Sequence, residues 1–284
     1  MELLVEFCHK NHLNDSYIDG IILPLEHYSV ESMVSFSMEE IKKIQKEFSC
    51  KVFVKINRNL LNQDIEVMKD ILIELDQCKI DGIFFYDLAI LQLKKELGLS
   101  IPLVWNQTHM VNNYRSCEEY YQRGVEYALL GKEITLEEIK EIQKKSHIQC
   151  MVEVVSRPSI AFSRRKLISH FYDDLGKVGD QSLRVTEKVS SLPIDLIESE
   201  DGTSFFSSIL TNGTSIIQDL FEAGIPYIIM REFGIEEFDE LVKDTKEYLL
   251  NCCQGNEYVM KYKKLGDCTN FFFQKTIYKV KKNG

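Results

Sequence analysis

Short apolar runs alternate with longer amphipathic stretches along this chain. Eight runs have the length of a β-strand, and most are rich in β-branched or aromatic residues: 3–7, 20–25, 51–56, 82–86, 101–105, 126–130, 150–155 and 226–230. Between them, apolar residues recur every three or four positions, which predicts helices over 39–48, 64–77, 135–146 and 235–251. Thr135 precedes Glu138 by three residues, the spacing of a helix-starting capping box.

This alternation predicts an α/β fold, a (β/α)8 TIM-barrel-like arrangement in which a helix follows each strand. The units repeat about every 20–30 residues up to position 155, a length that suits parallel strands joined by helical crossovers. A doubly wound open sheet is the alternative, and eight strand-like runs disfavour it.

The spacing changes after residue 155, which divides the chain into four parts. We expect barrel units one to seven in 1–155, an insertion in 156–225, the last barrel unit in 226–251 and a C-terminal tail in 252–284. The insertion should hold a helix near 163–171 and then a small antiparallel sheet built from LRVTEKV, PIDLIES and TSFFSSIL. The tail is extended, and we expect it to add a strand outside the barrel.

Composition narrows the class of protein. The 284 residues are 44% hydrophobic, enough for a large core, and the formal net charge of −10 argues against nucleic-acid binding by this chain alone. Glu2 and Glu6 interrupt the first apolar run, and no run has the length of a membrane helix, so we expect a cytoplasmic location. The eight cysteines are scattered and form no CxxC pair, which indicates reduced thiols; the role of the cluster Cys252, Cys253 and Cys268 stays open.

Active sites of such barrels lie where the strands end. Polar residues follow the predicted strands at Glu26, His27, Asn57, Asp87, Asn106, Gln107, Glu133, Ser156, Arg157, Arg231 and Glu232. The ligand-binding candidates among them are Asn57, Asn106, Gln107 and Arg157, together with His109 in the polar loop after the fifth strand. The alternative is that these positions are simply where strands meet water.

Known catalytic motifs do not occur. The six histidines show neither HExxH nor another metal-ligand spacing, and GxSxG, P-loop and GxGxxG patterns are missing, so we predict no metal site and no serine nucleophile. Arg164, Arg165 and Lys166 form a basic helix start in an acidic chain. Arg165 is therefore a candidate contact for an RNA phosphate or another anion, with a solvated face as the alternative.

Five segments resemble, in order, the collagenase-like peptidase family, peptidase family thirty-two of unassigned mechanism. They are 81–91, 105–124, 128–142, 153–177 and 201–234, and together they span most of the chain. The resemblance places Asp87 on the family's strand-end aspartate and Asn113 near a family asparagine, which makes Asn113 a further ligand-binding candidate. Lys132 and Glu133 fall on an Arg-Glu pair of the family.

Active members of that family hold an iron–sulfur cluster with four cysteines in and after the segment that resembles 153–177. The corresponding positions here are Ser159, Lys166, Gly179 and Leu183, and none of these residues supplies a thiolate. The resemblance thus implies no cofactor in this chain and a cluster carried by a partner.

The better-understood branches of the family resemble oxygen-independent hydroxylation systems. The short form is similar to the smaller member of a bacterial two-protein system for tRNA wobble uridine 5-hydroxylation. This implies an accessory or co-catalytic subunit in a heteromer with a larger, cysteine-bearing relative, through which it would meet tRNA. Two alternatives stay open: a collagenase-like peptidase, a hydrolase with Asp87, Glu133 and Glu153 as catalytic carboxylates, and a non-catalytic ligand- or partner-binding barrel.

Overall fold

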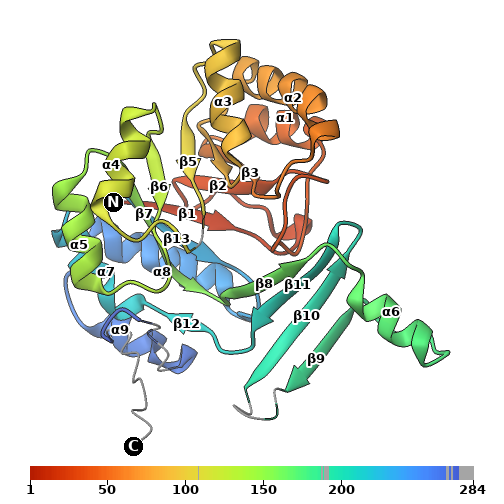
Figure 1. Cartoon of the computed structure of the whole chain (residues 1–284). Coiled ribbons are helices and arrows are strands. Elements are labelled where there is room, and N and C mark those ends of the chain that lie inside the picture. Colours follow the sequence, from red (N-terminus) through yellow and green to blue (C-terminus); the bar gives the residue numbers. More distant parts are fainter. Residues whose placement is uncertain (108, 187, 189–191, 267–268, 270, 275–284) are drawn as a thin grey trace, which may run out of the picture.

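Eight parallel strands form a closed barrel in the computed structural model of the chain, which describes all residues except 108, 187, 189–191, 267–268, 270 and 275–284 (Figure 1). The barrel strands are β1 (Glu2–Glu6), β2 (Gly20–Pro24), β3 (Lys51–Ile56), β4 (Gly82–Phe85), β5 (Leu103–Trp105), β6 (Tyr127–Leu129), β7 (Gln149–Ser156) and β13 (Tyr227–Arg231). Each strand pairs with the next, β7 pairs with β13, and β13 pairs with β1, which closes the ring. The predicted (β/α)8 barrel is confirmed.

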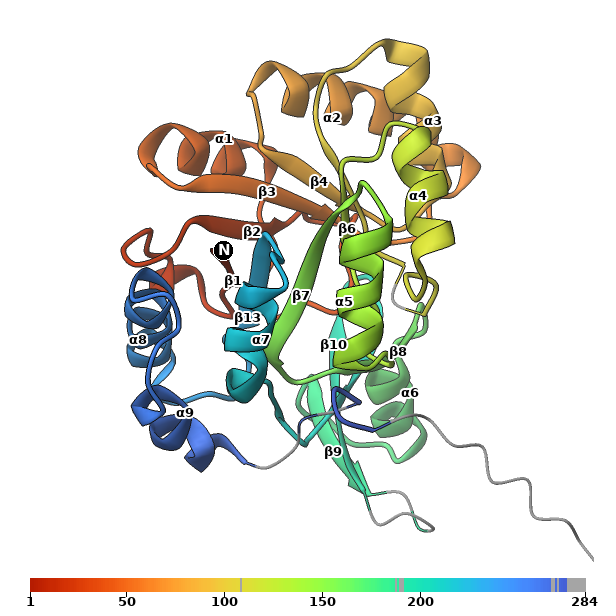
Figure 2. The ribbon, with the colours of Figure 1, turned by 90° about the vertical axis from the view of Figure 1, so that its left-hand side faces the viewer.

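Helices surround this ring of strands, as Figure 2 shows. They are α1 (Met38–Glu47), α2 (Ile65–Gln77), α3 (Leu88–Leu97), α4 (Tyr114–Gln122), α5 (Leu136–Lys145), α7 (Ile217–Glu222) and α8 (Phe238–Leu250). Short 3-10 turns are η1 (Lys10–His12), η2 (Asn62–Asp64), η3 (Thr214–Ile216) and η4 (Lys263–Leu265). The capping box at α5 is present: the Glu138 amide donates to Thr135 Oγ1 at 3.3 Å, and the Thr135 amide donates to Glu138 Oε2 at 2.7 Å.

The barrel interior is apolar at mid-height. Its filling side chains are Leu4, Ile22, Phe53, Phe84, Val104, Leu129, Met151, Tyr227 and Ile229. Gly82 leaves room for this packing, because a Cβ at that position would lie 2.9 Å from the Phe53 ring. Side chains alternate along a strand, so the residue two positions after each mid-height residue also faces the interior, one layer nearer the strand ends.

A second, four-stranded antiparallel sheet lies beside the strand ends of the barrel (Figure 1). Its order is β8 (Ser159–Ser163), β11 (Gly202–Ser207), β10 (Pro193–Ser199) and β9 (Ser182–Thr186), and α6 (Leu167–Asp174) packs on β10 and β11. Helix α6 begins where Glu198 accepts hydrogen bonds from the Ile168 and Ser169 amides. Gly202 has φ of +142°, and a Cβ there would lie 2.1 Å from the Ser163 carbonyl oxygen, so the β10–β11 turn requires glycine.

The end of the 156–225 interval belongs to the barrel. Strand β12 (Thr211–Asn212) pairs antiparallel with β7, and α7 joins the ring of helices. After α8 the described chain forms α9 (Glu257–Tyr262), with Cys252 exposed and Cys253 buried. Cys268 lies outside the described residues, and so do residues 275–284 of the segment 271–284 in which a strand is expected; residues 271–273 form a turn. Among the helices that the structure describes, none has the length and apolar character needed to span a bilayer.

Candidate functional site

Four charged side chains form the interior layer nearest the strand ends. Glu6, Lys55, Glu153 and Arg231 each follow a mid-height interior residue by two positions. Lys55 Nζ lies 2.7 Å from Glu6 Oε1, and both side chains are at most 5% exposed. Arg231 Nε lies 2.8 Å from Glu153 Oε2 and 3.5 Å from Glu6 Oε2. Lys132, just after β6, completes the network with its Nζ 2.6 Å from Glu153 Oε1.

The network fixes the protonation of its members. Burial alone would raise the pKa of Glu153, but the charges of Arg231 and Lys132 outweigh it and lower this pKa to about 2. Burial also opposes ionisation of Glu6, and Arg231 and Lys55 again hold its pKa below the ordinary value. The pKa of Lys55 is lowered, chiefly by burial and also by Arg231, although Glu6 acts in the other direction. Both carboxylates are therefore ionised at neutral pH and held by cations, which makes them poor proton donors.

Not every polar atom of this layer has a hydrogen bond. Within the described part of the chain, Glu6 Oε2, Glu153 Oε2 and Arg231 Nε are buried without an aligned hydrogen-bond partner, although Arg231 lies within ion-pair distance of both carboxylates. Buried polar atoms of this kind are usually satisfied by water or by a ligand. These atoms can therefore still form hydrogen bonds to a water molecule or a ligand at the mouth of the barrel.

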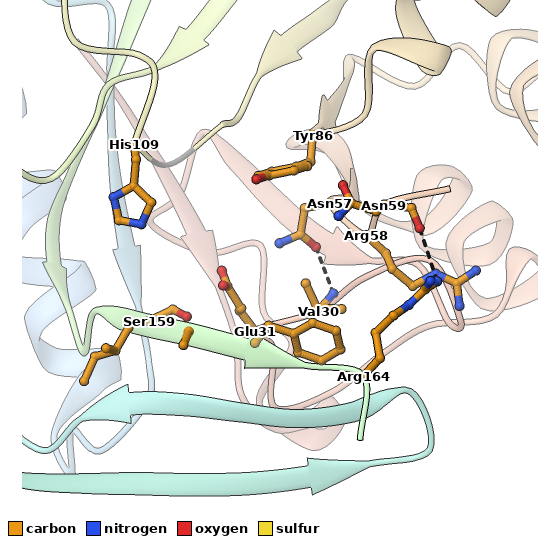
Figure 3. Close-up of a pocket in the computed structure, with 12 residues that line it drawn as sticks. Val30, Glu31, Asn57, Arg58, Asn59, Tyr86, His109, Ser159 and Arg164 are labelled. Atoms are coloured by element: carbon orange, nitrogen blue, oxygen red, sulfur yellow. Dashed lines mark hydrogen bonds between the residues drawn. The ribbon is translucent and has the colours of Figure 1, made fainter. Parts of the chain in front are cut away.

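A cavity of about 280 Å³ lies at the mouth of the barrel, against strand β8 (Figure 3). Its lining combines amides, arginines, an imidazole, one carboxylate, two aromatic rings and a few aliphatic side chains: Val30, Glu31, Asn57, Arg58, Asn59, Tyr86, His109, Arg164 and residues 159–162 of β8. Asn57 is fixed, because its Oδ1 accepts a hydrogen bond from the Val30 amide at 2.9 Å. Arg164 donates to the Asn59 carbonyl at 3.5 Å. This lining and size suit a small polar ligand or one nucleotide base.

The predicted ligand-binding residues fall into two groups. Asn57 and His109 line the cavity, and Asn106 is buried at the end of β5. Gln107 holds the segment that carries the cavity residue Tyr86. Its side chain accepts a hydrogen bond from Trp105 Nε1 at 2.9 Å and donates one to the Tyr86 carbonyl at 2.6 Å.

The remaining ligand-binding candidates lie elsewhere. Asn113 caps α4 by accepting from the Ser116 amide at 2.9 Å. Arg157 is bound to Asp195 at 2.9 Å. Arg165 is exposed just before α6.

The three predicted catalytic carboxylates do not come together. Only Glu153 belongs to the buried network. Asp87 caps α3, with one carboxylate oxygen accepting from the Ala89 amide and the other from the Leu60 amide, both at 2.9 Å. The Glu133 side chain is 55% exposed and lies 3.6 Å from the ring of His109.

Comparison with known proteins identifies the family. Residues 11–257 match the model of Peptidase family U32. The chain belongs to peptidase family U32. It is 25% identical to the tRNA hydroxylation protein P2 of Bacillus subtilis (strain 168) over 89% of this chain and 90% of that protein. The tRNA hydroxylation protein P1 of the same organism is 21% identical over 54% of this chain, but that match spans only 37% of P1.

A solved U32 structure has the same fold. The U32 peptidase Mk0906 superposes with a TM-score of 0.51 and 13% identity, covering 82% of this chain and 94% of that one. At this level of identity the likeness concerns the fold alone.

The four positions that the U32 resemblance assigns to an iron–sulfur cluster do not fit one in this chain. Ser159 is on β8 and Leu183 is on β9, the two outer strands of the antiparallel sheet, so about 14 Å of sheet separates them. Lys166 directly precedes α6, and Gly179 lies in the exposed loop after that helix. None of the four side chains is a thiolate, the ligand such clusters need.

Sequence reasoning missed two members of the charged layer, Glu6 and Lys55, as well as the cavity residue Tyr86. A signal was present: Glu6 and Lys55 interrupt apolar strand runs, two positions after a large apolar residue. In a strand buried on both faces, a charge with that period must face the barrel interior. For Arg231, the sequence predicts only a position at a strand end.

Proposed function

We propose that this U32 protein is an accessory or co-catalytic subunit in oxygen-independent tRNA wobble uridine 5-hydroxylation. The observation that carries the proposal is the nearly end-to-end match to tRNA hydroxylation protein P2, which covers 89% of this chain and 90% of that protein. The match between this chain and P1 spans only 37% of the length of P1. A short member working with a longer relative is therefore the arrangement we infer, in the cytoplasm where tRNA is modified.

The net charge of this chain supports the inference that it needs a partner to bind tRNA. A net charge of −10 opposes binding of the tRNA backbone, whose recognition needs Lys and Arg contacts to phosphates. The longer relative would supply most of these contacts as well as the iron–sulfur cluster. In this chain, the exposed Arg164 and Arg165 beside the cavity are the candidates for a local phosphate contact.

Exposed apolar side chains support a docking surface on the antiparallel sheet and α6. Ile160, Phe171, Leu175, Val185 and Ile209 are 36–51% exposed although they are large and apolar. All five lie within residues 160–209, in the antiparallel sheet, in α6 or at its end, or in the segment just after β11, and exposed apolar side chains in one module are candidates for an interaction site. We infer that the longer relative binds here, next to the cavity.

The cavity suits a base presented by that partner. Asn57 and Asn59 offer amide groups, and Tyr86 offers a ring, the two kinds of contact by which proteins hold unstacked RNA bases. The chain would then shape the substrate site, while redox chemistry belongs to the partner.

The peptidase alternative has less support from the geometry. The Asp87 carboxylate is occupied by backbone amides, Glu133 is exposed, and Glu153 is held ionised by Lys132 and Arg231. A hydrolase would need one of them free to take or give a proton near a substrate.

Nucleoside mass spectrometry of total tRNA tests the proposal. The gene is deleted in a strain that keeps the longer relative but lacks every wobble-uridine hydroxylation pathway independent of it, and the strain is complemented with wild type, Arg164→Glu or Arg115→Glu. Arg115 is an exposed arginine of α4 that is not part of the cavity lining, and it serves as the charge-matched control. We expect 5-hydroxyuridine derivatives to vanish on deletion, to return with wild type and Arg115→Glu, and to stay reduced with Arg164→Glu. Unchanged tRNA in the deletion strain would refute the role.

A further inference from the structure

The loop after β1 and the residue after β13 meet at one edge of the barrel mouth. β1 and β13 are parallel neighbours, with Glu6 opposite Arg231, and the Glu232 amide donates to the Glu6 carbonyl at 3.1 Å. The chain leaving β1 then turns through η1, which carries His12 and directly follows His9. The fold thus brings together residues that are 220 positions apart in the sequence.

His9, His12 and Glu232 form a compact group of metal-ligating side chains. One nitrogen or oxygen atom from each lies within 4.8 Å of the others. The two imidazole rings have centroids 4.8 Å apart at an angle of 62°, and His12 Nδ1 contacts Glu232 Oε1. Ligand atoms around one zinc ion lie about 3.3 Å apart for bonds of about 2.0–2.2 Å, so a small rotation of the exposed histidine rings closes the group.

The carboxylate of Glu232 differs from the two carboxylates of the charged layer. Glu232 is only 7% exposed, and among the described residues its carboxylate contacts the Cys8 amide at 2.5 Å and the ring of His12. Glu6 and Glu153, by contrast, contact lysine or arginine. A buried carboxylate without a lysine or arginine partner among the described residues is stabilised by a nearby positive charge, and a bound cation would supply it.

We propose that His9, His12 and Glu232 bind a divalent transition-metal ion of the Zn²⁺ type. Two imidazoles and one carboxylate suit zinc and its neighbours in the first transition row, whereas Mg²⁺ and Ca²⁺ prefer oxygen ligands alone. The Cys8 amide orients the carboxylate, as outer hydrogen bonds do at metal sites. Because both histidines are exposed, the ion keeps positions open to solvent or to a partner's ligand. Bound there, it ties the β1 loop to the end of β13, next to the charged layer.

This site is independent of the proposed function, and the sequence did not indicate it. Two of the ligands, His9 and His12, lie three positions apart in the sequence HKNH. The third ligand, Glu232, lies 220 positions after His12. Only the closure of the barrel between β1 and β13 brings Glu232 to them.

Isothermal titration of the EDTA-treated full chain with ZnCl2 tests the site. The variants are His9→Ala, Glu232→Gln and, as a matched control, His147→Ala. His147 is an exposed histidine that also contacts a carboxylate, with its Nδ1 3.0 Å from Glu118. Circular dichroism establishes the fold of each variant, and His9 is exposed, so its removal should leave the fold intact.

We expect one zinc ion per wild-type chain, binding at least about tenfold weaker in His9→Ala and Glu232→Gln, and unchanged binding in His147→Ala. Zinc should raise the melting temperature of wild type but not of His9→Ala. Equal zinc binding by wild type and His9→Ala would overturn the site, and so would equal affinity for MgCl2. A thiolate charge-transfer band on loading with Co²⁺ would contradict the ligand set.

Discussion

Replacing Glu153 with glutamine is the most informative perturbation of the charged layer. The carboxylate is 2% exposed and faces Lys132 at 2.6 Å and Arg231 at 2.8 Å. Glutamine keeps the shape but leaves two buried cations without their common anion. Breaking a buried ion pair in this way costs about 3–5 kcal/mol.

The pKa of Glu153 gives an independent magnitude. This pKa is about 2 in the folded chain against 4.5 for the free side chain. A carboxyl group whose pKa is lower in the folded chain stabilises the fold at pH values above its unfolded-state pKa. This stabilisation is lost as the pH falls toward the folded-state pKa. The difference corresponds to about 3 kcal/mol at pH 7, falling to about 1 kcal/mol at pH 3.

Urea unfolding followed by tryptophan fluorescence measures both effects. The chain has one tryptophan, Trp105 at the end of β5, stacked on Tyr120 with ring centroids 3.8 Å apart, so the signal reports the barrel. Wild type should exceed Glu153→Gln in unfolding free energy by about 3 kcal/mol at pH 7, with the gap narrowing by about 2 kcal/mol at pH 3. The exposed Glu133→Gln should stay within about 0.5 kcal/mol of wild type. The reasoning would be refuted if wild type exceeded Glu153→Gln by less than about 0.5 kcal/mol at pH 7, or if this difference did not change with pH.

Three further substitutions test other parts of the structure. Asp87→Ala should cost about 1 kcal/mol in urea unfolding and Asp87→Asn less, because the side chain is a helix cap; equal losses would contradict that role. Gly202→Ala drives a Cβ against the Ser163 carbonyl, so limited proteolysis should cleave within 159–207 first, and a wild-type cleavage pattern would count against it. Lys55→Met removes the cation nearest to Glu6 and should lower the unfolding free energy at pH 7 by about 3–5 kcal/mol; a loss under 1 kcal/mol would mean that Arg231 alone suffices.

The barrel could be predicted from the sequence because its strands are buried on both faces. Such strands appear as short, nearly continuous apolar runs, and the amphipathic stretches between them fit crossover helices. Strand β8 escaped detection because Ser159–Ser163 is short and partly exposed, and lies beside the mouth rather than in the core. Its pairing with β11, about forty residues away, is a tertiary contact that no local pattern encodes.

The site was harder to predict because one residue type serves several purposes at a strand end. Asp87 and Asn113 follow strands as active-site residues do, yet both cap helices, since Asp and Asn are also the preferred caps. Glu6 and Lys55 carried a usable signal in the period of two along the strand. The group of His9, His12 and Glu232 required the closed ring of strands and was not accessible from spacing.

Reconstitution in a second host tests the central claim most directly. This chain and the longer U32 relative proposed as its partner are expressed separately and together in a bacterium from which every tRNA uridine hydroxylation gene has been removed. Mass spectrometry then measures 5-hydroxyuridine in the tRNA of each strain. The account predicts the modification only when both proteins are present, with the two recovered as one complex. Full modification by the longer relative alone, or none with both proteins expressed and folded, would contradict it.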